Sequence, residues 1–153
     1  MNLVLWRHAE AHELREGEQD LDRTLTSRGE KQAKRMAQWL DRQLPDLTRV
    51  LVSPARRTEQ TAQALGRKYK VRQELAPGAT VVHLLEAVQW PDDKSTVLVV
   101  GHQPLLGQTI AQLLGLNASD CAVKRGAVWW LRSRERDASQ QTVVVTVQSP
   151  EIL

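Results

Sequence analysis

Short uninterrupted runs of hydrophobic residues alternate along the chain with longer segments in which hydrophobic residues recur every three or four positions. Uninterrupted runs are typical of strands that are buried on both faces of a parallel sheet. Three of these runs are clear: residues 3–6, 49–52 and 96–100. A weaker run at residues 71–75 predicts a further strand. Residues 127–131 and 142–147 predict two late strands that can pair as a hairpin across a polar loop.

The segments with helical spacing predict four amphipathic helices: residues 27–44, 54–65, 81–90 and 105–114. Ser27 and Glu30 have the spacing of a capping box at the start of the first helix, although Thr26 can cap this helix instead. Ser53 followed by Pro54 predicts the cap and the first residue of the second helix.

The order of these elements predicts a three-layer α/β/α fold, in which helices cover a mostly parallel central sheet with an antiparallel edge strand. At 153 residues the chain fits a single domain, residues 1–153. Its content of 41% hydrophobic and 25% charged residues is ordinary for a soluble globular protein.

Three features of the sequence bear on the cellular compartment. The first hydrophobic run is interrupted at Arg7, too early for a secretory signal, and no run is long enough to cross a membrane. Cys121 is the only cysteine, which excludes an internal disulfide and fits a reducing compartment. We therefore expect a cytoplasmic protein.

Candidate catalytic side chains directly follow three of the predicted strands. Arg7 and His8 follow the first strand, Arg57 lies just beyond the second, and His102 follows the strand at residues 96–100. Ligands of open α/β sheets bind past the carboxyl ends of the strands, so these groups would meet if the strands are neighbours. Arginine suits phosphate or carboxylate, and a neutral histidine can act as nucleophile or base.

Two of these groups also lie where helices begin, and the first N–H groups of a helix attract anions. Together they predict a positively charged cup of the size of a phosphate group. The net charge of +3 suits an anionic ligand and does not require nucleic acid.

Four motifs in these regions resemble those of the histidine phosphatase (phosphoglycerate-mutase-like) superfamily. They are the Arg-His motif at residues 7–10, the first-helix signature at 25–33, the second arginine motif at 53–61 and the second histidine at 101–102. They occur in the family's order over residues 1–107. The small size and residues 50–54 are most similar to the SixA-type phosphohistidine phosphatases. One departure is Ala9, where the family usually has glycine.

The resemblance implies a metal-independent phosphatase without a cofactor, in which a histidine attacks phosphorus and forms a phosphohistidine intermediate. The residues that it implicates are His8 as the nucleophile, Arg7, Arg57 and His102 as ligands of the phosphate oxygens, and Arg23 as a substrate contact. Arg56 is expected at the surface. Other family members use a glutamate to protonate the leaving group. Glu74 and Glu86 are candidates here, although both are better explained as surface residues.

The spacing of the motifs bears on the substrate. Only 45 residues separate Arg57 from His102, and the predicted elements occupy most of them, so little chain remains for a lid. An open site suits phosphohistidine on a phosphorylated protein, such as a histidine phosphotransfer domain, with phosphate or another oxyanion in the site and no nucleic-acid or membrane partner. Two alternatives stay open: a small-molecule phosphatase or mutase on the same scaffold, and a non-catalytic module that recognises phosphate.

Competing motifs are weaker. Residues 20–24 match the Asp-x-Asp-x-Thr of Mg²⁺-dependent haloacid-dehalogenase phosphatases, but they follow a polar segment where that motif needs a buried strand. Residues 8–12 resemble a zinc-binding pair, but no Pro-Cys-x-x-Cys follows. Trp129 and Trp130 lie near Lys124 and Arg125 and could stack on RNA bases, yet burial in a strand explains them more simply.

Overall fold

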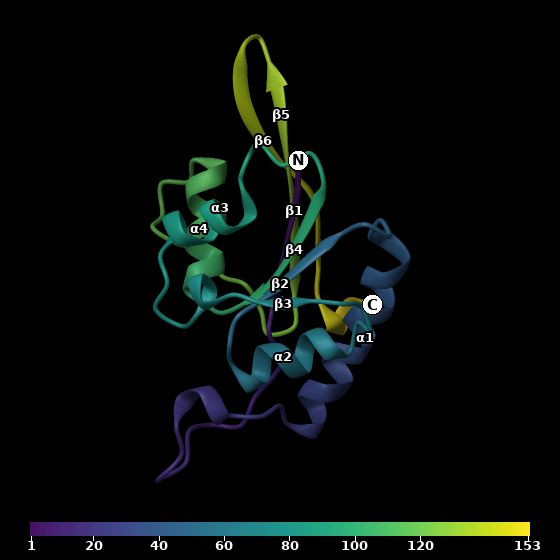
Figure 1. Cartoon of the computed structure of the whole chain (residues 1–153), viewed down its shortest axis with the longest axis vertical. Helices are drawn as coiled ribbons and strands as arrows, with labels where there is room; N and C mark the ends of the chain where they lie inside the picture. Colours follow the sequence, from purple (N-terminus) through teal and green to yellow (C-terminus); the bar gives the residue numbers. More distant parts are fainter.

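A six-stranded sheet in the order β3-β2-β4-β1-β5-β6 forms the centre of the computed structural model, which covers residues 1–153. Its strands are β1 (Asn2–Arg7), β2 (Arg49–Val52), β3 (Lys70–Val71), β4 (Thr96–Gly101), β5 (Val128–Arg136) and β6 (Ser139–Gln148). The first four run parallel to one another, whereas β5 and β6 form an antiparallel hairpin at one edge. Figure 1 shows that this hairpin extends beyond the rest of the sheet.

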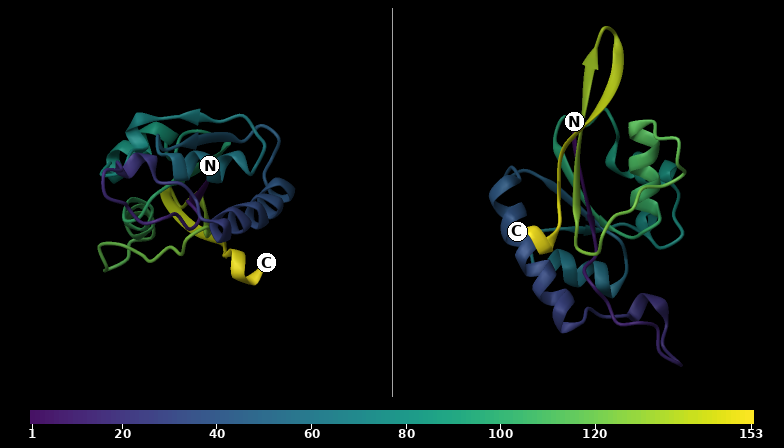
Figure 2. Two further views of the ribbon diagram at one scale, coloured as in Figure 1. Left: turned by 90° about the horizontal axis from the view of Figure 1, so that it is seen from below. Right: turned by 180° about the vertical axis from the view of Figure 1, so that it is seen from behind.

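Four helices cover the two faces of the sheet, and this confirms the predicted three-layer architecture (Figures 1 and 2). One face packs against α1 (Ser27–Gln43) and α2 (Arg56–Gln63), and the other packs against α3 (Val81–Val88) and α4 (Leu105–Leu114). Short 3₁₀ turns lie at η1 (Asp20–Asp22), η2 (Gln73–Leu75) and η3 (Pro150–Ile152). None of the helices combines the length and the apolar character that a membrane span requires.

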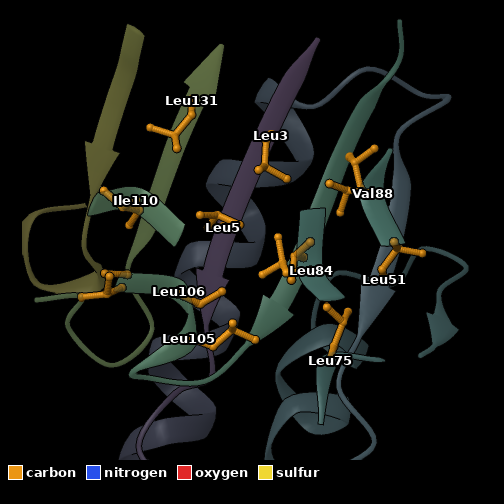
Figure 3. Close-up of a cluster of buried hydrophobic side chains, with 14 residues drawn as sticks. Leu3, Leu5, Leu51, Leu75, Leu84, Val88, Leu105, Leu106, Ile110 and Leu131 are labelled. Carbon is orange, nitrogen blue, oxygen red and sulfur yellow. The ribbon is translucent and has the colours of Figure 1, made fainter. Parts of the chain in front are cut away.

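Side chains of the central strands alternate between two hydrophobic clusters because successive residues of a strand point to opposite faces. In β1, Leu3 and Leu5 contribute to the cluster beneath α3 and α4, which Figure 3 shows. Val4 and Trp6 contribute to the cluster beneath α1 and α2. Helices on both sides thus explain why β1 is an uninterrupted hydrophobic run in the sequence.

Two predicted strand boundaries were wrong. The strand predicted at residues 71–75 is limited to Lys70–Val71, because the chain then turns into η2 and buries Leu75 in the core. The polar loop predicted at residues 132–141 is instead part of β5 and β6, which pair with each other there although neither face of the hairpin is hydrophobic. Asp137 and Ala138 form the turn with φ of 52° and 63°, as two-residue hairpins require.

Two helix starts differ from those predicted. Thr26 caps α1, because its side chain accepts a hydrogen bond from the N–H of Gly29, and the capping box proposed for Ser27 was wrong. Ser53 does not cap α2, which has Ala55 at its N-cap without a side-chain bond. The hydroxyl of Ser53 is instead hydrogen-bonded to a side chain of the candidate site.

Candidate active site

The carboxyl ends of β1, β4 and β2 lie next to one another, and this brings the sequence motifs together. Arg7 pairs with Gly101 across the β1–β4 ladder, and the N–H of His8 donates to the carbonyl of Gly101 at 3.1 Å. The N–H of Ser53 donates to the carbonyl of Val100 at 3.1 Å. Three segments that are distant in sequence therefore leave the sheet at the same level.

A polar cavity of about 220 Å³ lies at this edge of the sheet. All five residues that the sequence implicated line it: Arg7, His8, Arg23, Arg57 and His102. Glu13, Gln103 and Arg125 line it as well, although the sequence analysis had not placed them there. A larger groove of about 600 Å³ runs along β2 and the segment before β3, and it includes none of these five side chains.

The two candidate leaving-group acids lie outside the cavity. Glu74 is paired with Arg72 at 2.9 Å, and Glu86 is exposed on α3. Both are surface residues, as expected. Glu13, which is exposed, is the one carboxylate side chain among the residues that line the cavity.

His8 is buried, with 7% of its surface exposed, and its tautomer follows from its hydrogen bond. Its Nδ1 lies 2.7 Å from the carbonyl oxygen of Ala9. A carbonyl can only accept, so Nδ1 carries the proton and Nε2 keeps a free lone pair. Burial, followed by the charges of Arg57 and Arg7, lowers the pKa of His8 to about 3 despite the opposing bond to Ala9. The ring is therefore neutral at pH 7.

The second histidine, His102, stands beside the first, with ring centroids 5.4 Å apart. Its Nε2 is hydrogen-bonded to Oγ of Ser53 at 2.6 Å, whereas its Nδ1 is buried without a partner. Burial, and then the neighbouring His8 and Arg57, lower the pKa of His102 to about 3. Both imidazoles of the site are thus neutral at pH 7.

Two arginines supply fixed positive charge. The side chain of Arg57 is only 4% exposed, and that of Arg7 donates to the carbonyl of Val123 at 2.7 Å. Burial lowers the pKa of both guanidinium groups, which still stay charged at neutral pH. Nε of Arg7, Nε of Arg57 and Nδ1 of His102 are three of the four buried side-chain polar atoms that have no hydrogen-bond partner. Such atoms are uncommon in folded proteins, and an oxygen-rich anion is a ligand that suits such a group of donors.

One carboxylate, Asp20 in η1, already contacts this cationic group. Its Oδ2 accepts from Nη2 of Arg57 at 3.0 Å, its Oδ1 accepts from Nε of Arg23 at 3.0 Å, and its main-chain oxygen accepts from Nη1 of Arg57 at 2.8 Å. Partial burial raises the pKa of Asp20, but the hydrogen bond and charge of Arg57, with those of Arg23, lower it overall. Asp20 is therefore an anion that partly neutralises two candidate phosphate ligands.

The segment that carries His8 is anchored to α2. The N–H of Ala9 donates to Oγ of Thr61 at 3.1 Å, and the Thr61 hydroxyl donates to the carbonyl of Arg57 at 2.7 Å. Ala9 is fully buried and packs in a small cluster with Leu25 and Ala33. Its methyl group therefore packs against these two residues, and Ala9 is not among the residues that line the cavity.

The same segment is anchored to α1 by the first-helix signature. The carbonyl of Glu10 lies so close to Gly29 that a Cβ at this position would collide with it. The side chain of Gln32 accepts from the N–H of Glu10 at 3.0 Å, and that of Gln60 accepts from the N–H of Leu25 at 2.8 Å. These contacts explain why Thr26, Gly29 and Gln32 recur at three-residue intervals: they lie on the side of α1 that contacts the His8 segment.

The competing interpretations gain no support from the structure. No group of three or more His, Cys, Asp and Glu side chains is arranged to hold a metal ion. Trp130 is 9% exposed and donates its indole N–H to Oδ1 of Asn2 at 3.0 Å, so its place within the sheet explains it.

Comparisons with known proteins relate the chain to one family. Residues 3–83 match the sequence model of the histidine phosphatase superfamily (branch 1). The chain is 33% identical to a phosphohistidine phosphatase SixA homolog of Haemophilus influenzae over 131 residues, which is 75% of this chain and 78% of that protein. It is also 33% identical to phosphohistidine phosphatase SixA of Escherichia coli over 121 residues, 74% of each chain.

The fold is also shared with solved structures. The protein histidine phosphatase SixA complexed with tungstate superimposes with a TM-score of 0.82 and 28% sequence identity, and the match covers 99% of both chains. The family model covers more than half of the present chain, and the two bacterial relatives cover about three quarters of it. The chain therefore belongs to the histidine phosphatase superfamily, as a phosphatase of the SixA type.

Proposed function

We propose that this phosphatase removes phosphate from phosphohistidine on a protein, with His8 as the nucleophile. One observation carries the proposal. The hydrogen bond from Nδ1 of His8 to the Ala9 carbonyl leaves a free lone pair on Nε2, in a cavity lined by Arg7 and Arg57. A neutral imidazole that is fixed beside two guanidinium groups can attack phosphorus at neutral pH without first losing a proton.

The proposed reaction has two steps. In the first, the Nε2 lone pair of His8 forms a bond to phosphorus. The bond from phosphorus to the substrate imidazole breaks, and the leaving nitrogen keeps the electron pair and takes a proton from solvent. In the second, water attacks the phosphorus of phosphorylated His8, and inorganic phosphate leaves as Nε2 recovers its lone pair.

The proposed phosphate ligands stabilise the charge on the transferred group. Arg7 and Arg57 each hold a buried Nε without a partner. If the Ser53 hydroxyl donates to Nε2 of His102, the proton of that ring lies on Nδ1, the third buried atom without a partner. We propose that Arg7, Arg57 and His102, which all line the cavity, hold the three equatorial oxygens of the phosphoryl group in transfer. Arg23, which lines the cavity and donates to Asp20, is proposed to bind the substrate.

The polarity of the cavity favours a substrate of which mainly the phosphate is bound there. Only one of its eleven lining residues is hydrophobic, so the cavity offers a small molecule little apolar contact. Binding energy beyond the phosphate must then come from a larger partner, such as a histidine phosphotransfer domain. The names of the Haemophilus and Escherichia relatives, and the tungstate in the SixA complex, support this assignment.

The absence of a buried carboxylic acid in the cavity fits the same substrate. Glu13 is the one lining carboxylate and is exposed. An imidazole leaves phosphorus more readily than an alkoxide does, so it depends less on a general acid. A sugar phosphate would need one.

The test compares kcat/KM for a histidine-phosphorylated phosphotransfer domain with values for a panel of sugar phosphates and a phosphoserine peptide. We expect the phosphohistidine protein to be preferred. A sugar phosphate preferred by about tenfold, or about 1.4 kcal/mol in transition-state binding, would favour the small-molecule alternative. Binding of the phosphoprotein without phosphate release would favour the non-catalytic module.

The nucleophile has a separate test. Brief reaction with a ³²P-labelled substrate is expected to yield a phosphoenzyme that is labile to acid and stable to base. His8→Ala should abolish both the label and turnover. An acid-stable adduct, or turnover in this variant, would exclude His8 as the nucleophile.

A further inference from the structure

The sheet has two very different edges. At one edge, β3 consists of two residues, Lys70–Val71. At the other edge, β6 runs for ten residues, Ser139–Gln148, and pairs only with β5. The outward row of N–H and C=O groups along β6 therefore has no strand partner, and Figures 1 and 2 show the end of this hairpin standing clear of the body.

β6 is long and lacks charged residues and proline, so a β-bulge is the one feature it has of those that usually protect an exposed edge. Residues 139–149 contain no Lys, Arg, Asp, Glu or Pro. By contrast, the outer part of β5 carries Arg132, Arg134, Glu135 and Arg136. Val144 and Val145 remain 43% and 40% exposed. One irregularity exists: the ladder shifts register between Trp130 and Leu131, which leaves Val145 as an extra residue on β6.

The sequence of β6 is nearly the same in both directions. Residues 139–149 read Ser-Gln-Gln-Thr-Val-Val-Val-Thr-Val-Gln-Ser, a palindrome about Val144 that is broken only by the pair Gln141 and Val147. If two copies of this strand pair antiparallel about Val144, Thr142 lies opposite Thr146 of the other copy and Val143 lies opposite Val145. Paired threonines and paired β-branched side chains are favourable cross-strand neighbours, and no charge is placed opposite a like charge.

We propose that β6 is an interface for a second copy of this chain. The two strands pair antiparallel about a two-fold axis through Val144 and join two six-stranded sheets into one. The palindrome favours a second copy over a different protein, because in a two-fold strand pair it places threonine opposite threonine and valine opposite valine around the axis. An uncharged strand also offers little by which a specific unrelated partner could be selected.

Two consequences follow for strength and activity. A single strand pair buries less than the roughly 1,200 Å² that is typical of stable complexes, and the extra residue Val145 lies beside the axis, so association should be weak and concentration-dependent. The cavity lies at the ends of β1, β2 and β4, and β5 lies between these three strands and β6. Dimer formation should therefore leave the phosphatase activity unchanged, and the inference does not depend on the proposed substrate.

Sedimentation velocity at concentrations from the low micromolar to the millimolar range tests the interface. The wild-type chain is expected to shift reversibly from monomer to dimer. Val144→Lys and Val144→Glu should each remain monomeric, because like charges meet on the axis. An equimolar mixture of the two should dimerise again, because lysine then faces glutamate. Val82→Lys is the matched control on α3, where the valine is 59% exposed, and it should dimerise as the wild type does.

A wild-type chain that stays monomeric at every concentration would overturn the proposal, as would a dimer that both charged variants leave unchanged. Circular dichroism and phosphatase activity verify that the variants are folded. Val144→Cys in a Cys121→Ser background provides a second measurement if the charged variants unfold. A disulfide-linked dimer on mild oxidation is expected, and a failure to cross-link would contradict a two-fold axis at Val144.

Discussion

Replacing Arg57 by lysine tests whether the site needs the shape of a guanidinium group or only its charge. The Arg57 side chain is 4% exposed, and its Nη1 and Nη2 donate to Asp20 at 2.8 and 3.0 Å. Its Nε is buried without a partner. Lysine would keep the positive charge, but its single nitrogen cannot contact Asp20 and also occupy the position of Nε.

The expected loss follows from the number of donors. If Nε of Arg57 contacts a phosphate oxygen in the transition state, Arg57→Lys removes one fixed donor. Loss of one such donor typically costs about 2.7–4 kcal/mol, or about 10²–10³ in kcat. Because the contact strengthens as charge develops, kcat and kcat/KM should fall together, and KM should change little.

Arg56→Lys is the matched control, because Arg56 is the preceding residue of α2 and is exposed. Its steady-state kinetics should stay close to those of the wild type because Arg56 does not line the cavity, and its free energy of unfolding should change by less than about 0.5 kcal/mol. Urea denaturation of both variants separates catalytic loss from unfolding. A large loss for Arg56→Lys with a silent Arg57→Lys would show that the second arginine motif is aligned one residue out of register.

Four further experiments address other parts of the structure. Asp20→Asn should tighten competitive inhibition by inorganic phosphate about tenfold, because Arg57 and Arg23 lose a neutralising carboxylate; an unchanged inhibition constant would contradict this. Thr26→Ala should cost about 1 kcal/mol of unfolding free energy and Ser27→Ala less than about 0.5 kcal/mol, and equal losses in urea denaturation would disprove the assignment of the cap. His8 and His102 have pKa values lowered to about 3, so the unfolded chain binds more protons than the folded one between about pH 6.5 and pH 3. The free energy of unfolding should therefore fall as the pH drops through this range, by up to about 1.4 kcal/mol per pH unit for each histidine. His8→Asn should make the decline in Tm with falling pH less steep, and an unchanged slope in this variant would contradict the lowered pKa of His8. Activity should survive EDTA, and a loss that Mg²⁺ restores would redirect attention to Asp20 and Asp22.

The parts of the fold that were predicted from the sequence are those with a strong local cause. Residues 3–6 and 96–100 are uninterrupted hydrophobic runs because helices cover both faces of β1 and β4. The rule that ligands bind past the ends of parallel strands then brings His8 and His102 together, as their ring separation of 5.4 Å shows. Local hydrophobicity and one topological rule were sufficient for these placements.

The failures have tertiary causes. The strand was expected at residues 71–75 partly because Leu75 is hydrophobic. Leu75 is indeed buried, but it lies in a 3₁₀ turn and not in a strand of the sheet. The loop expected at residues 132–141 is polar because the hairpin extends beyond the sheet, where neither face needs to be hydrophobic. Ser53 has the local pattern of a helix cap, but its hydroxyl bonds to His102, 49 residues further along the chain.

Asp20 shows the limit of sequence reasoning within the site. The only pattern in its segment is a motif of a different phosphatase family, and the absence of a preceding buried strand argues against that motif. Its actual contact, with Arg57, spans 37 residues and arises because the segment between β1 and α1 returns across the edge of the sheet. No local sequence pattern predicts such a return of the chain. The contact nevertheless lowers the net positive charge of the cavity to which a phosphate would bind.

Much of the family signature serves to fix the segment that carries His8, the proposed nucleophile, and does not itself line the cavity. Thr61 bonds to the N–H of Ala9, Gln32 bonds to the N–H of Glu10, and Gly29 leaves room for the Glu10 carbonyl. Residues of α1 and α2, which lie on one face of the sheet, thus hold Ala9 and Glu10 in place. The carbonyl of Ala9, which these contacts hold in place, accepts the hydrogen bond from Nδ1 of His8 and so keeps the lone pair of Nε2 available. The proposed reactivity of His8 therefore depends on side chains in α1 and α2 that are absent from the cavity wall, and the spacing of the motifs in sequence reflects this need to hold the His8 segment in place.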